Sequence, residues 1–204
     1  MISHCIVPGT IALTFDDGPS PYTPHLLDLL AQHNAKATFF ILGGAGNAEP
    51  EGDLSLLHII NAAGHQLASH TWDHEDLATL SPPAVLAQIT QTEDAFRNTL
   101  GFIPTYFRCP YLSCGDAMGV LGERGYKIVG VDLDTDDWKG DYGVAERNFE
   151  QGLGYGNIVL AHDIKEKTVY ELAEFMLELV AERGLRAVTV GECLGEGREG
   201  WYRP

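Results

Sequence analysis

The sequence predicts an α/β fold, in which a parallel sheet is covered by helices, in a single domain that spans residues 1–204. Short apolar runs alternate along the chain with amphipathic helical patterns, and this alternation is typical of parallel sheets. A length of 204 residues suits one domain, and the chain contains no low-complexity tract, fixed-period repeat or long linker. These patterns leave open whether the sheet is doubly wound or closed as a barrel.

Seven apolar runs, each bounded by Gly, Pro or polar clusters, are predicted as strands. They are "TIALTF" at 10–15, "ATFFIL" at 37–42, "HQLAS" at 65–69, "TYFR" at 105–108, "KIVGVDL" at 127–133, "NIVLA" at 157–161 and "RAVTV" at 186–190. Helical patterns with recognisable ends lie between them. "TPHLLDLLAQ" begins at Thr23, "PPAVLAQITQTEDAFRNTL" follows Ser81 and stops before Gly101, and "TVYELAEFMLELVAERG" stops at Gly184.

Acidic residues dominate the charge of the chain. Asp and Glu number 29 against 13 Lys and Arg, which gives a formal net charge of -16. This charge would repel a nucleic-acid backbone or an anionic membrane surface, so neither is expected as a partner, whereas a neutral glycan is compatible. No apolar stretch approaches the roughly 20 residues of a membrane span, and "MISHCIVPGT" lacks the features of a secretion signal. No protein partner is indicated.

Four cysteines permit three fully paired connectivities. The short spacing favours a local pair of Cys109 with Cys114, which leaves Cys5 to join Cys193 and tie the two ends of the chain together. Such bonds form in an oxidising compartment, so this pairing favours an extracellular or cell-wall location. Four reduced thiols in a cytoplasmic protein are the alternative.

Reactive side chains fall at the carboxyl ends of the predicted strands. In parallel α/β folds, ligands bind and catalytic residues converge at this edge of the sheet. The residues in question are Asp16 and Asp17 after the first strand, His70 after the third, Arg108 at the end of the fourth, Asp134 after the fifth and His162 after the sixth.

A metal site is predicted at this edge. "HTWDH" places His70 and His74 one helical turn apart, so both rings could hold one cation if the backbone is helical there. Asp16 or Asp17 would complete a set of two histidines and one carboxylate with open coordination positions. Such a set suits zinc-type hydrolysis or a non-haem iron oxygenase, and two solvent-facing histidines are the simpler alternative.

The neighbouring residues favour hydrolysis. A hydrolase needs a general base, a general acid and donors for an oxyanion. The carboxylate that does not bind the metal is the candidate base, and His162 is the candidate acid. Arg108 and either Asp134 or Asp137 are candidates to orient them. Each motif alone also fits an ordinary turn, loop or strand, so the prediction depends on all of them meeting at one edge.

Five motifs together closely resemble those of the NodB-homology polysaccharide deacetylases, the fourth carbohydrate esterase family. They are "TFDDGP" at 14–19, "HTWDH" at 70–74, "RCPY" at 108–111, "DTDDW" at 134–138 and "LAH" at 160–162. The resemblance covers about residues 10 to 165. It implies a distorted (β/α)7 barrel, a divalent metal that is usually zinc although cobalt or another transition metal is an alternative, and hydrolysis of an N-acetyl or O-acetyl group on a polysaccharide.

The resemblance also implies roles for individual residues. Asp17, His70 and His74 resemble the metal ligands, Asp16 resembles the catalytic base, and Arg108 would hold Asp16 in a salt bridge. Adjacent side chains on an extended backbone point to opposite faces, which would separate the roles of Asp16 and Asp17.

The acid side of the site and the substrate pocket are implied in the same way. His162 resembles the catalytic acid, and an aspartate of "DTDDW" would tune it, with Asp134 favoured over Asp137. The backbone N–H of Tyr111 would donate to the oxyanion, while Trp138 and Leu160 would shape the pocket for the acetyl methyl group. Cys109 departs from the family, in which many relatives carry proline at that position.

Within the family, "HTWDHEDL" and "RCPYLS" look most like fungal chitin deacetylases. The sequence therefore predicts a metal-dependent enzyme that removes acetyl groups from chitin or chito-oligosaccharides. The alternatives are a deacetylase of peptidoglycan or acetylxylan, or a glycan-binding barrel without catalysis.

Overall fold

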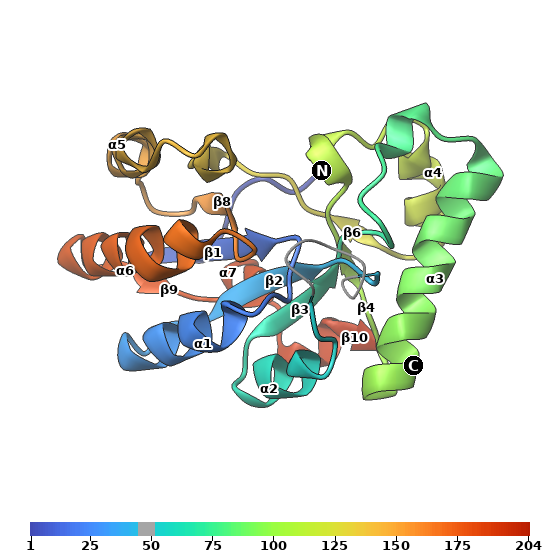
Figure 1. Ribbon diagram of the computed structural model, residues 1–204, viewed down its shortest axis with the longest axis horizontal. Helices are drawn as coiled ribbons and strands as arrows, with labels where there is room; N and C mark the ends of the chain where they lie inside the picture. The colour runs from blue at the N-terminus through green and yellow to red at the C-terminus, as the bar shows by residue number, and fades with distance from the viewer. Residues whose placement is uncertain (45–51) are drawn as a thin grey trace.

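The computed structural model describes residues 1–44 and 52–204, and its centre is a curled, mainly parallel sheet surrounded by helices (Figure 1). The strands pair in the order β6-β5-β3-β2-β1-β8-β7, and β9 pairs with the start of β1. They are β1 (Thr10–Asp16), β2 (Ala37–Ile41), β3 (Gln66–Ser69), β5 (Tyr106–Phe107), β6 (Lys127–Ile128), β7 (Leu133–Asp134), β8 (Ile158–His162) and β9 (Arg186–Ala187). A separate antiparallel pair joins β4 (Ile103–Pro104) to β10 (Tyr202–Arg203).

The two edges of the sheet come from one stretch of chain. "KIVGVDL" is predicted as a single strand, but the structure divides it into β6, which pairs with β5, and β7, which pairs with β8. The N-terminal segment enters beside this break, where Ile2 bridges to Val129 and His4 bridges to Asn157. The sheet therefore curls back toward itself, and the predicted distorted (β/α)7 barrel is confirmed.

Helices cover the outside of the sheet, with α1, α2, α3 and α6 arranged around it in Figure 1. Their bounds are α1 (Thr23–Gln32), α2 (Leu56–Ala62), α3 (Pro82–Leu100), α4 (Ala117–Glu123), α5 (Tyr142–Gly152), α6 (Ala173–Glu182) and α7 (Val190–Cys193), with a π-helical turn η5 (Thr168–Leu172) before α6. Short 3₁₀ turns are η2 (Leu77–Thr79), η3 (Pro110–Leu112), η4 (Asp137–Lys139) and η6 (Arg198–Gly200). None of the helices described is long and apolar enough to cross a membrane.

The three predicted helices are present, and a second predicted strand, besides the divided run at 127–133, is partly wrong. Gly101 ends α3 in the left-handed conformation with φ 80°, as a C-terminal glycine should. The run at 186–190 forms only the short β9 and then turns into α7. Thr189 caps that helix, because its side chain accepts a hydrogen bond from the N–H of Glu192. In turn, the Glu192 carboxylate accepts one from the N–H of Thr189.

Two disulfides join the cysteines as the spacing favoured. Cys5 is bonded to Cys193, which joins the N-terminal segment to the end of α7, and Cys109 is bonded to Cys114 beside the fourth predicted strand end. All four cysteines are buried. Cys5 and Cys193 pack with apolar residues inside the barrel, whereas Cys109 and Cys114 pack in a cluster between the sheet, α3 and α4.

Strand register determines where the reactive residues lie. Asp16 at the end of β1 pairs with His162 at the end of β8, and His70 directly follows β3. Because these strands are parallel, their carboxyl ends open at one rim. The rim is therefore where the predicted catalytic and metal-binding residues meet.

Candidate active site

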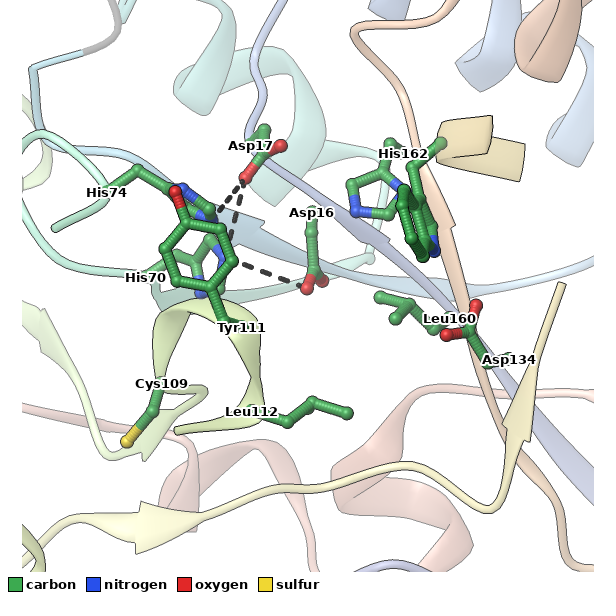
Figure 2. Close-up of a pocket in the computed structure, with 11 residues that line it drawn as sticks. Asp16, Asp17, His70, His74, Cys109, Tyr111, Leu112, Asp134, Leu160 and His162 are labelled. Atoms are coloured by element: carbon green, nitrogen blue, oxygen red, sulfur yellow. Dashed lines mark ion pairs between the residues drawn. The ribbon is translucent and has the colours of Figure 1, made fainter. Parts of the chain in front are cut away.

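A cavity of about 410 Å³ opens at this rim (Figure 2). Its lining contains nine of the residues predicted for the site, together with Cys109 and Leu112, which were not predicted to line it. The lining residues are Asp16, Asp17, His70, His74, Cys109, Tyr111, Leu112, Asp134, Trp138, Leu160 and His162. The remaining predicted residues, Arg108 and Asp137, are fully buried behind this lining.

The two adjacent carboxylates leave β1 differently from the expected alternation. Asp16 is the last strand residue, but Asp17 has φ 73° and lies in the left-handed region, outside the strand. In Figure 2 the Asp17 carboxylate points toward His74 and His70, while Asp16 lies between these rings and His162. The backbone turn at Asp17, rather than strand pleating, separates the two carboxylates.

Gly18 follows this turn because there is no room for a larger residue. A Cβ atom at Gly18 would collide with the carboxylate of Asp163, which is fully buried. Asp163 accepts a hydrogen bond from Thr23 Oγ1 at 2.5 Å, and its carbonyl accepts one from Ser20 Oγ at 2.6 Å. Burial, aided by the charges of the carboxylates nearby, raises the pKa of Asp163 to about 7. Asp163 was not predicted as a site residue, and its place next to the histidine in "LAHD" was the one available signal.

Three side chains form a candidate metal centre. Asp17 Oδ1 lies 3.4 Å from Nε2 of His70 and 3.4 Å from Nε2 of His74, and one ligand atom from each residue lies within 4.8 Å of the others. His70 Nδ1 is 2.8 Å from the carbonyl oxygen of Arg108. That carbonyl can only accept, so Nδ1 carries a proton, and it is the neutral form of the ring that would present an Nε2 lone pair to a metal beside Asp17.

The two histidines do not lie on a helical turn. The backbone from His70 to His74 is a loop, with Thr71 at φ 75° and His74 at φ 63°. The side chain of Gln88 on α3 holds this loop, because its Oε1 accepts hydrogen bonds from the N–H groups of Trp72 and Asp73. Both rings nevertheless face one point, so the expected pairing holds while the expected helix is wrong.

The electrostatics of this group fit a cation. Asp17 Oδ1 is buried and has no hydrogen-bond partner among the described residues. Burial alone would raise the pKa of Asp17, but the approach of His70 and the neighbouring imidazoles lowers it well below its usual range. Burial and the charge of His70 lower the pKa of His74. An ionised carboxylate facing two imidazole nitrogens is a suitable donor set for a divalent metal.

Asp16 is held by a buried arginine. Arg108 Nη1 donates to Asp16 Oδ1 at 2.7 Å and to Thr14 Oγ1 at 2.7 Å, and Nη2 donates to the carbonyl oxygen of Gly130 at 3.2 Å. The guanidinium also lies 4.0 Å from the centre of the Phe40 ring. Arg108 has no exposed surface, and Asp16 is 3% exposed. A charge pair with these additional contacts fixes the Asp16 carboxylate in one orientation.

The aspartate beside His162 is Asp137, not Asp134. Asp137 Oδ1 lies 2.7 Å from His162 Nδ1, and Oδ2 accepts from the His162 backbone N–H at 2.8 Å and from Thr168 Oγ1 at 2.7 Å. Burial acts to lower the pKa of His162, but Asp137 outweighs it and raises the pKa to about 9. Asp134 instead lines the cavity, where its Oδ1 accepts from the N–H of Asp136 at 2.8 Å.

Apolar side chains form the walls of the cavity. Trp138 is 53% exposed and Tyr111 is 68% exposed, while Leu160 is 7% exposed at the inner end. The Tyr111 ring meets the His74 ring edge to face, with centroids 4.6 Å apart. Leu112 extends across the lower part of the cavity in Figure 2. These walls suit a small apolar group held next to the metal ligands and Asp16.

Comparisons with known proteins agree with this geometry. The family model described as polysaccharide deacetylase matches residues 5–129. A chitin deacetylase of Pestalotiopsis sp is 44% identical over 100% of this chain and 70% of its own length. A probable peptidoglycan-N-acetylglucosamine deacetylase of Arthroderma benhamiae is 40% identical over 100% of this chain and 48% of its own length. The solved structure of the chitin deacetylase from Colletotrichum lindemuthianum has a TM-score of 0.92 and 40% identity, and the match covers 99% of this chain and 94% of that one. The chain therefore belongs to the polysaccharide deacetylase family.

Proposed function

We propose that this protein hydrolyses the N-acetyl groups of chitin or chito-oligosaccharides, releasing acetate and leaving glucosamine units. The observation that carries the proposal is the meeting of three groups in one cavity: a candidate metal centre, an arginine-held carboxylate and an aspartate-held histidine. Amide hydrolysis needs all three, as electrophile, base and acid. A glycan-binding barrel would have no use for a buried Arg108 that fixes Asp16.

Asp17, His70 and His74 would hold the metal. Zinc fits this donor set best, with cobalt or another transition metal as alternatives. When bound, the cation supplies Lewis acidity beside Asp16 and the cavity. The chemistry of proton transfer then falls to the side chains on either side of the metal ligands.

Asp16 is assigned as the general base. Its Oδ1 is occupied by Arg108, so Oδ2, which lies 3.7 Å from His70 Nε2, faces the metal centre and can accept a proton from the attacking water. Arg108 also places a positive charge next to the two adjacent carboxylates. The base is thereby held in one orientation before substrate arrives.

His162 is assigned as the general acid. Its Nδ1 is engaged by Asp137, so the opposite ring nitrogen, Nε2, remains to protonate the departing amine of the sugar. The raised pKa keeps the ring as imidazolium at neutral pH. Asp137 is a positioning residue, and we propose no catalytic role for Asp134.

The acetyl group would lie between the apolar walls. Trp138 and Leu160 would contact its methyl group, and the N–H of Tyr111 would donate to the oxyanion that forms as water attacks. One such donor typically contributes about 3 to 4 kcal/mol to the transition state.

The substrate and the location follow from the relatives and the cysteines. The chitin deacetylases are the most similar relatives reported above, which favours chitin as the substrate. A related protein is named as a probable peptidoglycan deacetylase, so peptidoglycan is one alternative, and acetylxylan is the other. Two disulfides suit an oxidising compartment, and we infer that the protein works outside the cell or in the cell wall.

The test is acetate release from acetylated chito-oligosaccharides, from peptidoglycan and from acetylxylan, with and without a chelator. We expect release from the chito-oligosaccharides, loss of release after chelation and its return when zinc is added back. Release from another glycan alone would change the substrate but keep the mechanism. No release from any of the three, with zinc present, would contradict the proposal.

A further inference from the structure

The loop between Cys109 and Cys114 has an unusual backbone. Tyr111 has φ 55° and Leu112 has φ 56°, so two consecutive residues with side chains adopt the left-handed conformation. Residues other than glycine rarely do so, because the Cβ atom approaches the following carbonyl oxygen. Such conformations persist only where the surrounding structure enforces them, and they gather at functional sites.

The tip of this loop is largely exposed to solvent. Tyr111 is 68% exposed and Leu112 is 36% exposed. The two ends of the loop are anchored instead, because Cys109 and Cys114 are 1% and 4% exposed and pack in a cluster with Leu77, Ile89, Phe107 and Leu121. Within the loop, the N–H of Leu112 donates to the carbonyl of Cys109 at 3.0 Å. The buried disulfide is therefore a covalent link between the two anchored ends that can hold the exposed tip.

The same short segment carries several parts of the site. Arg108, immediately before the loop, binds Asp16 by its side chain and accepts from His70 by its carbonyl. Tyr111 and Leu112 form one wall of the cavity, and Figure 2 shows their loop next to the candidate metal centre. A change of loop conformation would move the proposed oxyanion donor and this wall together.

We propose that Cys109 and Cys114 are positioning residues, whose disulfide holds Tyr111 and Leu112 in the left-handed conformation that the reaction requires. The inference rests on the proposed function, because it assumes that the Tyr111 N–H stabilises the oxyanion. Neither cysteine contacts the reacting atoms in this assignment. Their effect is to keep most of the enzyme molecules in the competent loop conformation.

The first test is the double variant Cys109→Ala/Cys114→Ala, assayed for acetate release from chito-oligosaccharides. We expect kcat to fall about 10- to 100-fold, KM to change by less than about threefold and zinc binding to stay intact, since the metal ligands lie outside the loop. The matched control is Cys5→Ala/Cys193→Ala. It should lower the Tm by about 10 °C and leave kcat unchanged at temperatures where it is folded.

The second test determines whether activity is lost because the backbone at Leu112 leaves the left-handed conformation. Glycine adopts the left-handed conformation freely, whereas alanine does not, and both remove the Leu112 side chain. In the variant without the Cys109–Cys114 bond, we expect Leu112→Gly to give a kcat at least about threefold higher than Leu112→Ala. With the disulfide present, the two substitutions should give the same kcat within error.

A thermal measurement covers the case in which the double cysteine variant does not fold. With the disulfide present, Leu112→Gly should melt about 2 °C above Leu112→Ala, although glycine ordinarily lowers stability. An equal or lower Tm, or an undiminished kcat in Cys109→Ala/Cys114→Ala, would overturn the inference. If the wild-type protein with zinc releases no acetate, the proposed function fails. The Tm comparison then still decides whether the fold holds residue 112 in the left-handed conformation, which residues with a side chain disfavour.

Discussion

The two sides of the cavity satisfy their buried charges in different ways. On the acid side, Asp137 accepts hydrogen bonds from the His162 ring, the His162 backbone and Thr168, so its charge is neutralised within the protein. On the metal side, Asp17 Oδ1 is buried between two imidazoles and lacks a hydrogen-bond partner among the described residues. The protein alone completes the first side, whereas the second side presents a set of ligand atoms that a cation would complete.

This difference predicts how amino-acid substitutions on each side affect metal binding and turnover. A preorganised hydrogen-bonded pair stays in place whether or not ligand is bound, because its stabilising partners are parts of the fold. A group of ligands that includes a buried, unpaired carboxylate gains stability from its cation by mass action. Changes on the metal side should therefore affect both binding and turnover, while changes on the acid side should affect turnover and its pH dependence.

The largest effect is expected from His70→Ala, because it removes a ligand from the metal side. We expect zinc binding and acetate release to be lost together. At a zinc concentration about 100 times the dissociation constant, bound metal contributes about 2.7 kcal/mol to the free energy of unfolding, so the wild-type Tm should rise with added zinc. The variant should show no such rise. A variant that kept wild-type zinc affinity would contradict the assignment of this residue as a ligand.

A somewhat smaller loss is expected from Asp16→Asn, which lies between the two sides. The change removes the base but keeps a side chain of similar shape beside Arg108. We expect kcat to fall about 10²- to 10⁴-fold while zinc binding, measured by calorimetry, is largely retained. Near-normal turnover would show that another group accepts the proton from water.

On the acid side, Asp137→Asn should lower kcat about 10- to 100-fold and leave zinc binding unchanged. Asp137 raises the pKa of His162 to about 9, so the acid form is present below that pH and is lost as the pH rises through it. Without the carboxylate charge, the pKa falls and the alkaline limb of the kcat profile moves to lower pH. If the alkaline limb stayed in place, it would reflect the titration of a group other than His162.

The smallest effect is expected from Asp134→Asn, which serves as the matched control for Asp137→Asn. Both changes neutralise an aspartate of "DTDDW", but only Asp137 contacts His162. We expect Asp134→Asn to keep kcat within about threefold and to leave the alkaline limb unmoved. A shift of that limb in the Asp134 variant equal to the shift in the Asp137 variant would show that the sequence-based preference for Asp134 was right after all.

Much of the framework was predictable from local patterns. The strands after which Asp16, His70 and His162 stand were visible as apolar runs, because buried parallel strands are apolar on both faces. The pairing of Cys109 with Cys114 followed from spacing alone. Three details of the site were predicted wrongly, namely the strand alternation that would separate Asp16 from Asp17, a helical turn between the two histidines and the orienting role of Asp134. All three depend on backbone turns with positive φ, at Asp17, at His74 and at Asp136, which residue spacing does not report.

The sequence by itself determined the class of fold, the rim at which the reactive residues gather and the types of side chain that gather there. These properties depend on hydrophobic periodicity and on the direction of strands, which act locally along the chain. Only the tertiary structure decided that Gly18 is required because Asp163 fills the space behind it, and that Asp137 rather than Asp134 contacts His162. Such contacts join segments far apart in the chain, and their partners are determined by packing around the curled sheet.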